Sequence, residues 1–374
     1  MKLRPILSAA LLLSLAAGPV WAAGAPAILA ASSTAPDSQP VKIIDLRGDA
    51  TALGRQHAAA LAPSIKMLED QYLGQVLSDP LSRAAAGVLA MGFEPKLRPE
   101  HLAELKALAA NSHLSESDLM LANSFLDLMP TVACSTMTLP ADAAPDHIAR
   151  FARNLDFDSF NIADKHSVVL VYHPVGRYAF ATIGWPGMIG AVSGMNEFGL
   201  TLCNMEVPRG PGLVVKAMPY ALLYRCLLEH CKTVDETVKY LQDNPRQSAN
   251  NLMLMDAAGN RAVVELSPEK VVVRRGQDGT ALISTNHQRG QDADQPGLCD
   301  RYDYLHDNAK KLYGKIGPTQ LISMLEHVQQ GNLTMQSMIF EPANRVMYLA
   351  TGLLAADRKY IKIDLGARFK TAAP

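Results

Sequence analysis

Two short stretches carry the residue types needed for nucleophilic chemistry. The first is Thr131-Val132-Ala133-Cys134-Ser135-Thr136-Met137, and the second is Arg153-Asn154-Leu155-Asp156. A spacer rich in turn residues separates them, so the two runs are predicted to pair as a β-hairpin. Such pairing brings the Cys134 thiol near the Arg153 guanidinium and the Asp156 carboxylate. A nucleophile, a cation that favours its thiolate and an anchor for an amine would then meet at one place.

The spacing of the two charged partners sets a geometric condition on this hairpin. Arg153 and Asp156 are three residues apart, and side chains with that separation face opposite sides of a flat strand. We therefore expect the hairpin to end or to bulge between them.

Further polar groups stand at the ends of expected elements, where they are unusual for core sequence. Asn204 ends a strand that follows a glycine-flanked turn, Asn286 closes another strand, and Arg301 opens a helix. Simpler explanations exist for all these residues. A cysteine is often a small buried hydrophobe, an arginine and an aspartate can form a surface ion pair, and an asparagine at a strand end can serve a turn.

Composition bounds the possible functions. The chain has 374 residues, of which 48% are apolar, so it can bury a large core as one big domain or two. A net charge of −1 gives the protein no positive electrostatic field that would attract nucleic acid or anionic lipid. Five cysteines in so long a chain are no disulfide framework, and their odd number leaves at least one thiol unpaired within a monomer.

The N-terminus has the pattern of an export signal. Lys2 and Arg4 precede an apolar run from Ile6 to Ala17, and small residues near Val20-Trp21-Ala22 fit a cleavage site. The run is too short to span a bilayer comfortably, although an uncleaved membrane anchor is the alternative. We expect residues 1–25 to be removed and the mature protein to be periplasmic or secreted, without stable membrane insertion. Residues 26–40 are rich in Ala, Ser and Pro and are predicted to be a disordered linker.

The predicted elements change character at Cys134. Before it, a strand over 41–46 is followed by helices over 50–74, 98–110 and 119–129. After it come short strands, interrupted by a few helices; the strands are predicted over 167–172, 178–183, 200–204, 252–256, 261–266, 271–274, 281–285, 336–340, 346–350 and 360–365, and the helices over 218–231, 235–242 and 318–329. Many strands joined by hairpins predict a layered α+β fold with mainly antiparallel sheets.

Together these stretches resemble the N-terminal-nucleophile (Ntn) cysteine hydrolases. The likeness is greatest to the branch of acyl-coenzyme A:6-aminopenicillanic acid acyltransferases and related cysteine peptidases, with choloylglycine (bile salt) hydrolases and acid ceramidases more distant. The resemblance implies a four-layer αββα sandwich made as an inactive precursor. It also implies self-cleavage between Ala133 and Cys134, which would leave a helical light chain over 41–133 and a heavy chain over 134–374.

Roles for the site residues follow from this resemblance. The freed α-amino group of Cys134, with a reference pKa of about 7.7–8.0, takes the thiol proton, and the thiolate forms an acyl-enzyme. Arg153 stabilises the thiolate, Asp156 holds the new ammonium group, and Asn204 stabilises the oxyanion. Asn286 and Arg301 match positions that complete the polar ring in the bile salt hydrolases.

One departure from the pattern affects processing. Relatives often carry glycine before the cysteine, whereas this chain has Ala133, whose Cβ restricts the strained geometry that helps the peptide rearrange. Slow or partial cleavage is therefore one expectation. The alternative function is an uncleaved, catalytically weak relative that binds acylated ligands.

Other chemistries lack their signatures. No His-Glu-x-x-His or Cys-x-x-Cys spacing predicts a metal, no Gly-x-Ser-x-Gly predicts a serine hydrolase, and no Rossmann glycine pattern predicts a dinucleotide, so we expect no cofactor. We predict an exported, self-processing cysteine amidohydrolase or acyltransferase acting on the acyl–nitrogen bond of a small or medium-sized substrate. Hydrolysis is favoured because nothing marks a coenzyme A site. The expected partners are that substrate and the precursor's own two chains, with no nucleic acid, and the oligomeric state is left open.

Overall fold

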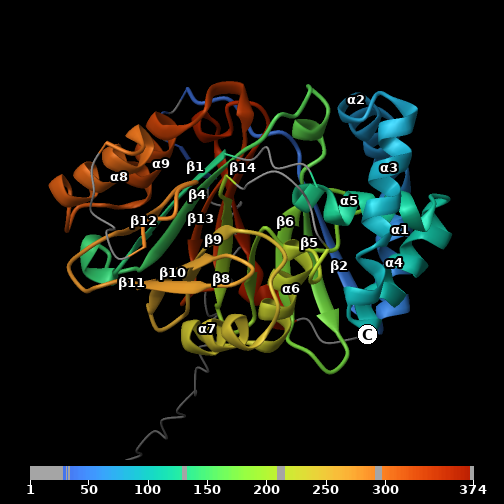
Figure 1. The fold of residues 1–374 in the computed structure, drawn as a ribbon. Coiled ribbons are helices and arrows are strands. Elements are labelled where there is room, and N and C mark those ends of the chain that lie inside the picture. Colours follow the sequence, from blue (N-terminus) through green and yellow to red (C-terminus); the bar gives the residue numbers. More distant parts are fainter. Residues whose placement is uncertain are drawn as a thin grey trace, which may run out of the picture.

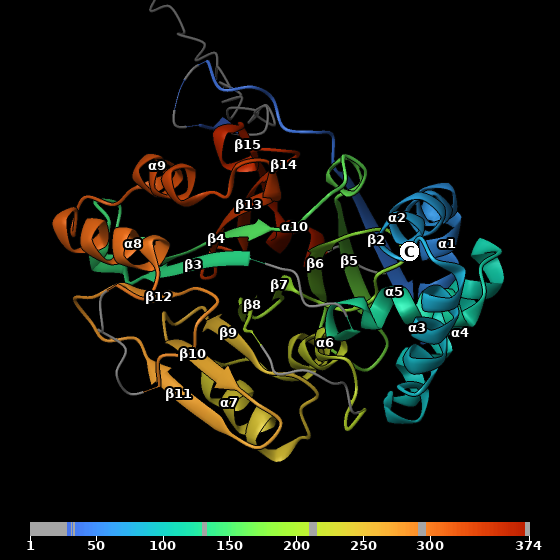
Figure 2. The same ribbon diagram turned by 45° about the horizontal axis from the view of Figure 1, so that its top comes forward.

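The computed structural model describes residues 28–30, 32, 34–128, 133–208, 215–290 and 297–370. They form two β-sheets packed face to face, with helices on both outer faces (Figures 1 and 2). This is the predicted α+β sandwich of four layers. In the part of the chain that is described, no helix is long and apolar enough to cross a membrane. The expected export signal over 1–25 lies outside the described residues.

The first sheet carries the predicted hairpin. Its strand order is β1-β15-β14-β13-β4-β3-β12, and all its neighbours are antiparallel. The strands are β1 (Ile28–Leu29), β3 (Ala133–Leu139), β4 (Arg150–Asp156), β12 (Leu282–Ser284), β13 (Thr334–Glu341), β14 (Val346–Thr351) and β15 (Tyr360–Asp364).

The second sheet has eight strands in the order β11-β10-β9-β8-β7-β6-β5-β2. All pairs are antiparallel except β2 with β5. The strands are β2 (Lys42–Gly48), β5 (Val168–Pro174), β6 (Phe180–Gly184), β7 (Ser193–Asn196), β8 (Thr201–Glu206), β9 (Asn250–Met255), β10 (Arg261–Leu266) and β11 (Val271–Arg275).

Helices cover each sheet with a separate apolar layer. Helices α8 (Asp300–Lys311) and α9 (Pro318–Val328) lie on the first sheet, where Leu305, Leu321 and Leu325 are fully buried. The second sheet is covered by α6 (Tyr220–His230), α7 (Val234–Asp243) and α1 (Ala50–Met67). The remaining helices are the π-helix η1 (Leu68–Leu73), α2 (Gly74–Val76), α3 (Pro80–Met91), α4 (Pro99–Ser112), α5 (Glu116–Leu128) and α10 (Leu365–Lys370).

The hairpin differs from the geometry expected from its sequence. Strand β4 ends at Asp156, and the register with β13 shifts there, because Asp156 pairs with Thr334 whereas Leu155 pairs with Gln336. A bulge of one residue thus lies beside Asp156. The prediction that the hairpin ends or bulges between Arg153 and Asp156 is wrong, because β3 and β4 pair in one register from Ala133–Asp156 to Leu139–Arg150 and the extra residue lies on β13.

The prediction of a disordered linker over 26–40 is wrong for its described part. Ile28–Leu29 pair with β15 as a short edge strand. The Gln39 N–H donates to the Thr351 carbonyl (3.0 Å), and the Thr351 hydroxyl donates to the Gln39 carbonyl (2.8 Å). Composition suggested disorder, but the backbone of this segment finds partners along β14 and β15.

A group of buried charges joins α4 to α6, and we call it the α4–α6 ion cluster: His101, Glu104, Arg177, Arg225 and Glu229. Arg225 donates to Glu104 (2.6 Å), to Glu229 (2.9 Å) and to the Ile189 carbonyl (3.1 Å). His101 lies 3.3 Å from Glu229, and Arg177 lies 3.4 Å from the same carboxylate. This cluster ties the helical segment 41–133 to the remainder of the protein.

Candidate active site

Strand register brings Cys134 and Arg153 to the same face of the hairpin. Cys134 pairs with Leu155, and Arg153 pairs with Thr136, two residues beyond Cys134 on β3. Residues two apart on a strand share a face, and so do residues directly opposite on its neighbour. The Arg153 Nη2 accordingly donates to the Cys134 Sγ at 3.3 Å. Both side chains are completely buried.

The Arg153 guanidinium is fixed by neutral groups. Its Nη1 donates to the Val192 carbonyl and to the Ser193 hydroxyl. Within the described part of the chain, no carboxylate forms an ion pair with it. Burial raises the pKa of the Cys134 thiol, and Arg153 opposes this rise. The uncleaved protein therefore holds a protonated thiol, which needs a base to become a nucleophile.

Asn286 and Arg301 hold the backbone of Cys134. The Cys134 N–H donates to the Asn286 Oδ1 (2.8 Å), and the Arg301 Nη1 donates to the Cys134 carbonyl (2.6 Å). The Arg301 Nη2 also donates to the Asn286 Oδ1 (3.1 Å), and the Asn286 Nδ2 donates to the Glu206 carbonyl (2.7 Å). Two residues far from Cys134 in the sequence thus hold its N–H and its carbonyl, one on each side of its Cα.

Asp156 lies opposite the bond that is predicted to be cleaved. It pairs across the hairpin with Ala133, and its Oδ1 accepts a hydrogen bond from the Thr334 hydroxyl (2.5 Å). Its Oδ2 is buried 3.6 Å from the Arg301 Nη1 and has no hydrogen-bond partner among the described residues. Burial raises the pKa of Asp156 to about 6, although Thr334 and Arg301 oppose this. The carboxylate lacks part of the compensation that a buried negative charge requires.

Asn204 lies next to this group but does not bond to Cys134. Its backbone N–H donates to the Val192 carbonyl (3.0 Å), which also accepts from Arg153. Its side chain makes no hydrogen bond with another described residue, and the residue lines a small cavity with Leu155 and Tyr220. The oxyanion role of Asn204 stays a prediction, with its amide available to a ligand.

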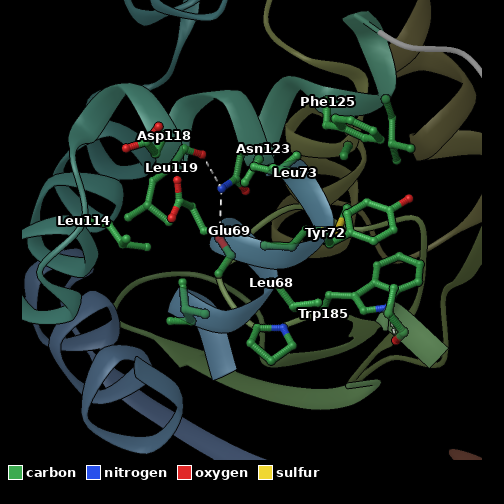
Figure 3. A pocket seen from close by; sticks show the side chains of 18 of the residues that line it. Leu68, Glu69, Tyr72, Leu73, Leu114, Asp118, Leu119, Asn123, Phe125 and Trp185 are labelled. Atoms are coloured by element: carbon green, nitrogen blue, oxygen red, sulfur yellow. Dashed lines mark hydrogen bonds between the residues drawn. The ribbon is translucent and has the colours of Figure 1, made fainter. Parts of the chain in front are cut away.

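A larger apolar pocket adjoins the site (Figure 3). Its volume is about 100 Å³. Aromatic rings of Tyr72, Phe125, Phe157 and Trp185 line it, and Asn123 fixes one wall by donating to the Gly187 carbonyl (2.9 Å). Phe157 and Trp185 also line the small cavity beside Asn204, so the two spaces adjoin.

Sequence reasoning did not find this pocket. Its walls come from η1, α5 and residues 185–188, which are distant in the chain. Each contributing residue has the ordinary pattern of a buried helix face or loop, so no local signal distinguishes the pocket lining from core. Ser193 and Thr334, which hold Arg153 and Asp156, were missed for the same reason.

Ala133 lies in β3 and is not among the described residues with positive φ. Its Cβ therefore causes no backbone strain in the uncleaved chain. All five cysteines are free thiols, and Cys203 lies close enough to Arg153 to contribute to its raised pKa.

Comparison with known proteins identifies the family to which this chain is similar. Residues 144–367 match the family described as acyl-coenzyme A:6-aminopenicillanic acid acyl-transferase, a match that begins after Cys134. Protein dcd1A of Dictyostelium discoideum is 23% identical over 338 residues, which cover 80% of this chain and 75% of that protein.

One similar solved structure is a conjugated bile acid hydrolase variant from Clostridium perfringens. Its TM-score to this chain is 0.47 and its sequence is 16% identical, and the match covers 63% of this chain and 93% of that protein. Another is the Caenorhabditis elegans ortholog of N-acylethanolamine-hydrolyzing acid amidase. Its TM-score is 0.46 and its sequence is 15% identical, and the match covers 56% of this chain and 93% of that protein. Since the family match spans more than half of the sequence, this chain belongs to the acyl-coenzyme A:6-aminopenicillanic acid acyl-transferase family of Ntn enzymes, which act on acyl–nitrogen bonds as hydrolases or acyltransferases.

Proposed function

We propose that this protein is an exported, self-processing cysteine amidohydrolase that forms an acyl-enzyme on Cys134. One observation carries the proposal. The Cys134 sulfur accepts a hydrogen bond from the Arg153 guanidinium. Asn286 and Arg301 bind the backbone N–H and the carbonyl of Cys134. A buried structural cysteine needs none of these contacts.

The first reaction is cleavage of the chain itself. The Cys134 sulfur attacks the Ala133 carbonyl carbon, the C–N bond breaks, and the Cys134 nitrogen takes up the thiol proton. Water then hydrolyses the thioester, which releases the Ala133 carboxylate and restores the thiol. The nitrogen becomes a free α-amino group, and Asp156, which pairs with Ala133 across the hairpin, has an oxygen without a hydrogen bond that can receive it.

The second reaction uses the new amine as a base. With a reference pKa of about 7.7–8.0 it accepts the thiol proton near neutral pH. Arg153 stabilises the thiolate, which attacks the substrate carbonyl, and the Asn204 amide donates to the resulting oxyanion. The ammonium protonates the leaving amine, and water then releases the acyl group from the sulfur.

The apolar pocket supports an apolar acyl group as the part of the substrate that is recognised. Its walls are mostly aromatic and aliphatic side chains, with polar groups from Glu69, Asp118, Asn123 and Asp127, and it adjoins the cavity beside Asn204. Burial of apolar surface in such a pocket contributes roughly 25 cal/mol per Å². We propose hydrolysis as the reaction because water reaches any acyl-enzyme, whereas nothing marks a coenzyme A site.

The test combines mass spectrometry with turnover. We expect purified protein to contain two chains that separate at residue 134, and Cys134→Ala to remain uncleaved and inactive. Cys134→Ser should cleave slowly, since a hydroxyl can make the same shift. Cys231→Ala, which removes a buried thiol outside the site, is the matched control and should behave as wild type.

A substrate panel then separates the finer possibilities. Acylated amino acids, penicillins, lactones and conjugated bile acids differ in both acyl group and leaving group. N-terminal sequencing of the light chain from culture fractions tests export, with a start near residue 26 expected. Active protein that remains one unbroken chain across 133 and 134 contradicts the proposal and favours an uncleaved relative that binds acylated ligands.

A further inference from the structure

Tyr220 carries a buried hydroxyl that nothing in the fold uses. It is the first residue of α6, is 2% exposed, and its hydroxyl has no hydrogen-bond partner among the described residues. Its backbone N–H donates to the Asp127 Oδ2 (3.0 Å), which fixes the start of the helix against α5. Most buried polar atoms in native proteins are paired, so an unpaired hydroxyl in a well-fixed residue requires an explanation.

The position of Tyr220 relates it to the catalytic group. Tyr220 and Asn204 line the same small cavity, of about 10 Å³, which is roughly the room of a single water-sized group. Two of the other lining residues belong to the site: Leu155 pairs with Cys134 across the hairpin, and the Val192 carbonyl accepts from Arg153. The cavity thus adjoins both the apolar pocket and Leu155, the residue that pairs with Cys134.

We propose that the Tyr220 hydroxyl is a second donor, beside the Asn204 amide, to the oxygen of the tetrahedral intermediate. The inference rests on the proposed function, because it requires attack by Cys134. A donor that is unpaired in the free enzyme and becomes paired when the oxyanion forms stabilises the transition state more than the ground state. Burial, together with Glu206 and Asp127, raises the pKa of Tyr220 well above its usual range, so the phenol keeps its proton.

The neighbouring Tyr224 provides a matched control. Its ring centroid lies 5.5 Å from that of Tyr220 in the same helix, and its side chain is also buried. Tyr224 does not line the cavity beside Asn204. A loss of one hydroxyl from this helix can therefore be compared at two adjacent sites, only one of which faces the reaction.

The experiment measures kcat and KM separately for Tyr220→Phe, Tyr224→Phe and Asn204→Ala on one amide substrate. Mass spectrometry confirms that each variant is fully cleaved, and thermal unfolding confirms that it is folded. Loss of one oxyanion donor typically costs about 10²–10³ in kcat, which is the drop we expect for Tyr220→Phe, with KM changed by less than about threefold. Tyr224→Phe should retain wild-type kcat.

The outcomes separate this inference from the proposed function. Wild-type kcat in Tyr220→Phe, alongside an inactive Cys134→Ala, overturns the inference and leaves the proposed function intact. Equal losses in Tyr220→Phe and Tyr224→Phe also overturn it, because they indicate a packing role. Wild-type activity in Cys134→Ala overturns the proposed function itself.

Discussion

Two buried guanidinium groups in this protein have opposite surroundings. Arg225, in the α4–α6 ion cluster, is bonded to two carboxylates and lies over the Tyr172 ring, 4.6 Å from its centroid. Arg153, beside Cys134, is bonded to a carbonyl, a hydroxyl and a sulfur. Both side chains are completely buried, so burial alone does not distinguish them.

The difference lies in how far each charge is already compensated. Burial opposes ionisation of Glu229, yet Arg225 and His101 hold the pKa of this carboxyl well below its usual range. At Asp156 burial prevails and raises the pKa to about 6. In the α4–α6 ion cluster the charges neutralise one another, which stabilises the fold. The charged groups around Cys134 are less fully neutralised, so they can stabilise the charges that form during a reaction.

The largest effect is expected when the compensated cluster is broken. Arg225→Met leaves Glu104 and Glu229 buried without their main partner, and such a loss typically destabilises by about 3–5 kcal/mol. Urea unfolding of the uncleaved Cys134→Ala protein measures it. The control is Lys239→Met, which removes an exposed, solvent-screened ion pair with Asp243 and should change the free energy of unfolding far less. Similar losses in both variants would refute the assignment of a structural role.

Arg153→Gln should leave the fold largely intact and act on the reaction. Without the guanidinium the thiolate loses its cation, and we expect kcat/KM to fall by about 10²–10³. Steady-state kinetics on the cleaved fraction provides the measurement. Arg177→Gln, at the edge of the α4–α6 ion cluster, should retain wild-type kcat/KM, so an equal loss there contradicts the division between the two clusters.

Asp156 should give the uncleaved precursor a distinctive pH dependence. Its folded pKa of about 6 lies above the usual value, so its contribution to stability is fully present below about pH 4 and is lost as the pH rises through 6. Relative to Asp156→Asn in the Cys134→Ala background, we expect a loss of about 2 kcal/mol between pH 4 and 7. Urea titrations at both pH values measure it; parallel behaviour of the two proteins would show that the carboxyl is not perturbed.

Thr334→Val should produce the smallest change. The Thr334 hydroxyl donates to the Asp156 Oδ1, and removal of a hydrogen bond to the charged form raises the pKa of this carboxyl further. The acid limb of the kcat/KM profile should therefore move to higher pH, by about half a unit to one unit. Thr334→Ser keeps a hydroxyl and serves as the control; an unmoved acid limb in the valine variant excludes Asp156 as its origin.

Sequence reasoning found the groups whose chemistry is evident from residue type. The structure brings Cys134, Arg153, Asp156, Asn286 and Arg301 together, although Arg153 lies in the middle of β4 and Asn286 lies two residues beyond β12. Their roles stay predictions. Tyr220 gave no such signal, because a tyrosine at the start of a buried apolar helix has the pattern of core.

Two missed elements have clear physical causes. Helix α3 exposes Leu81, Val88 and Leu89 to solvent, so its apolar residues do not mark a buried face as helical periodicity assumes. Strand β7 contains Gly194, which was interpreted as part of a turn. A Cβ at this position would lie 2.6 Å from the Ala181 carbonyl, so close approach of β6 to β7, and not a turn, explains the glycine.

The walls of the apolar pocket have a consequence for how substrate preference could change. Tyr72 and Phe125 belong to the segment before residue 134, whereas every side chain that holds the Cys134 sulfur or its backbone comes after it. Once the bond at 133 is cut, part of the pocket that selects the substrate would reside on a different polypeptide from the reactive groups. A light chain exchanged between relatives could then transfer acyl preference while leaving the chemical steps unaltered.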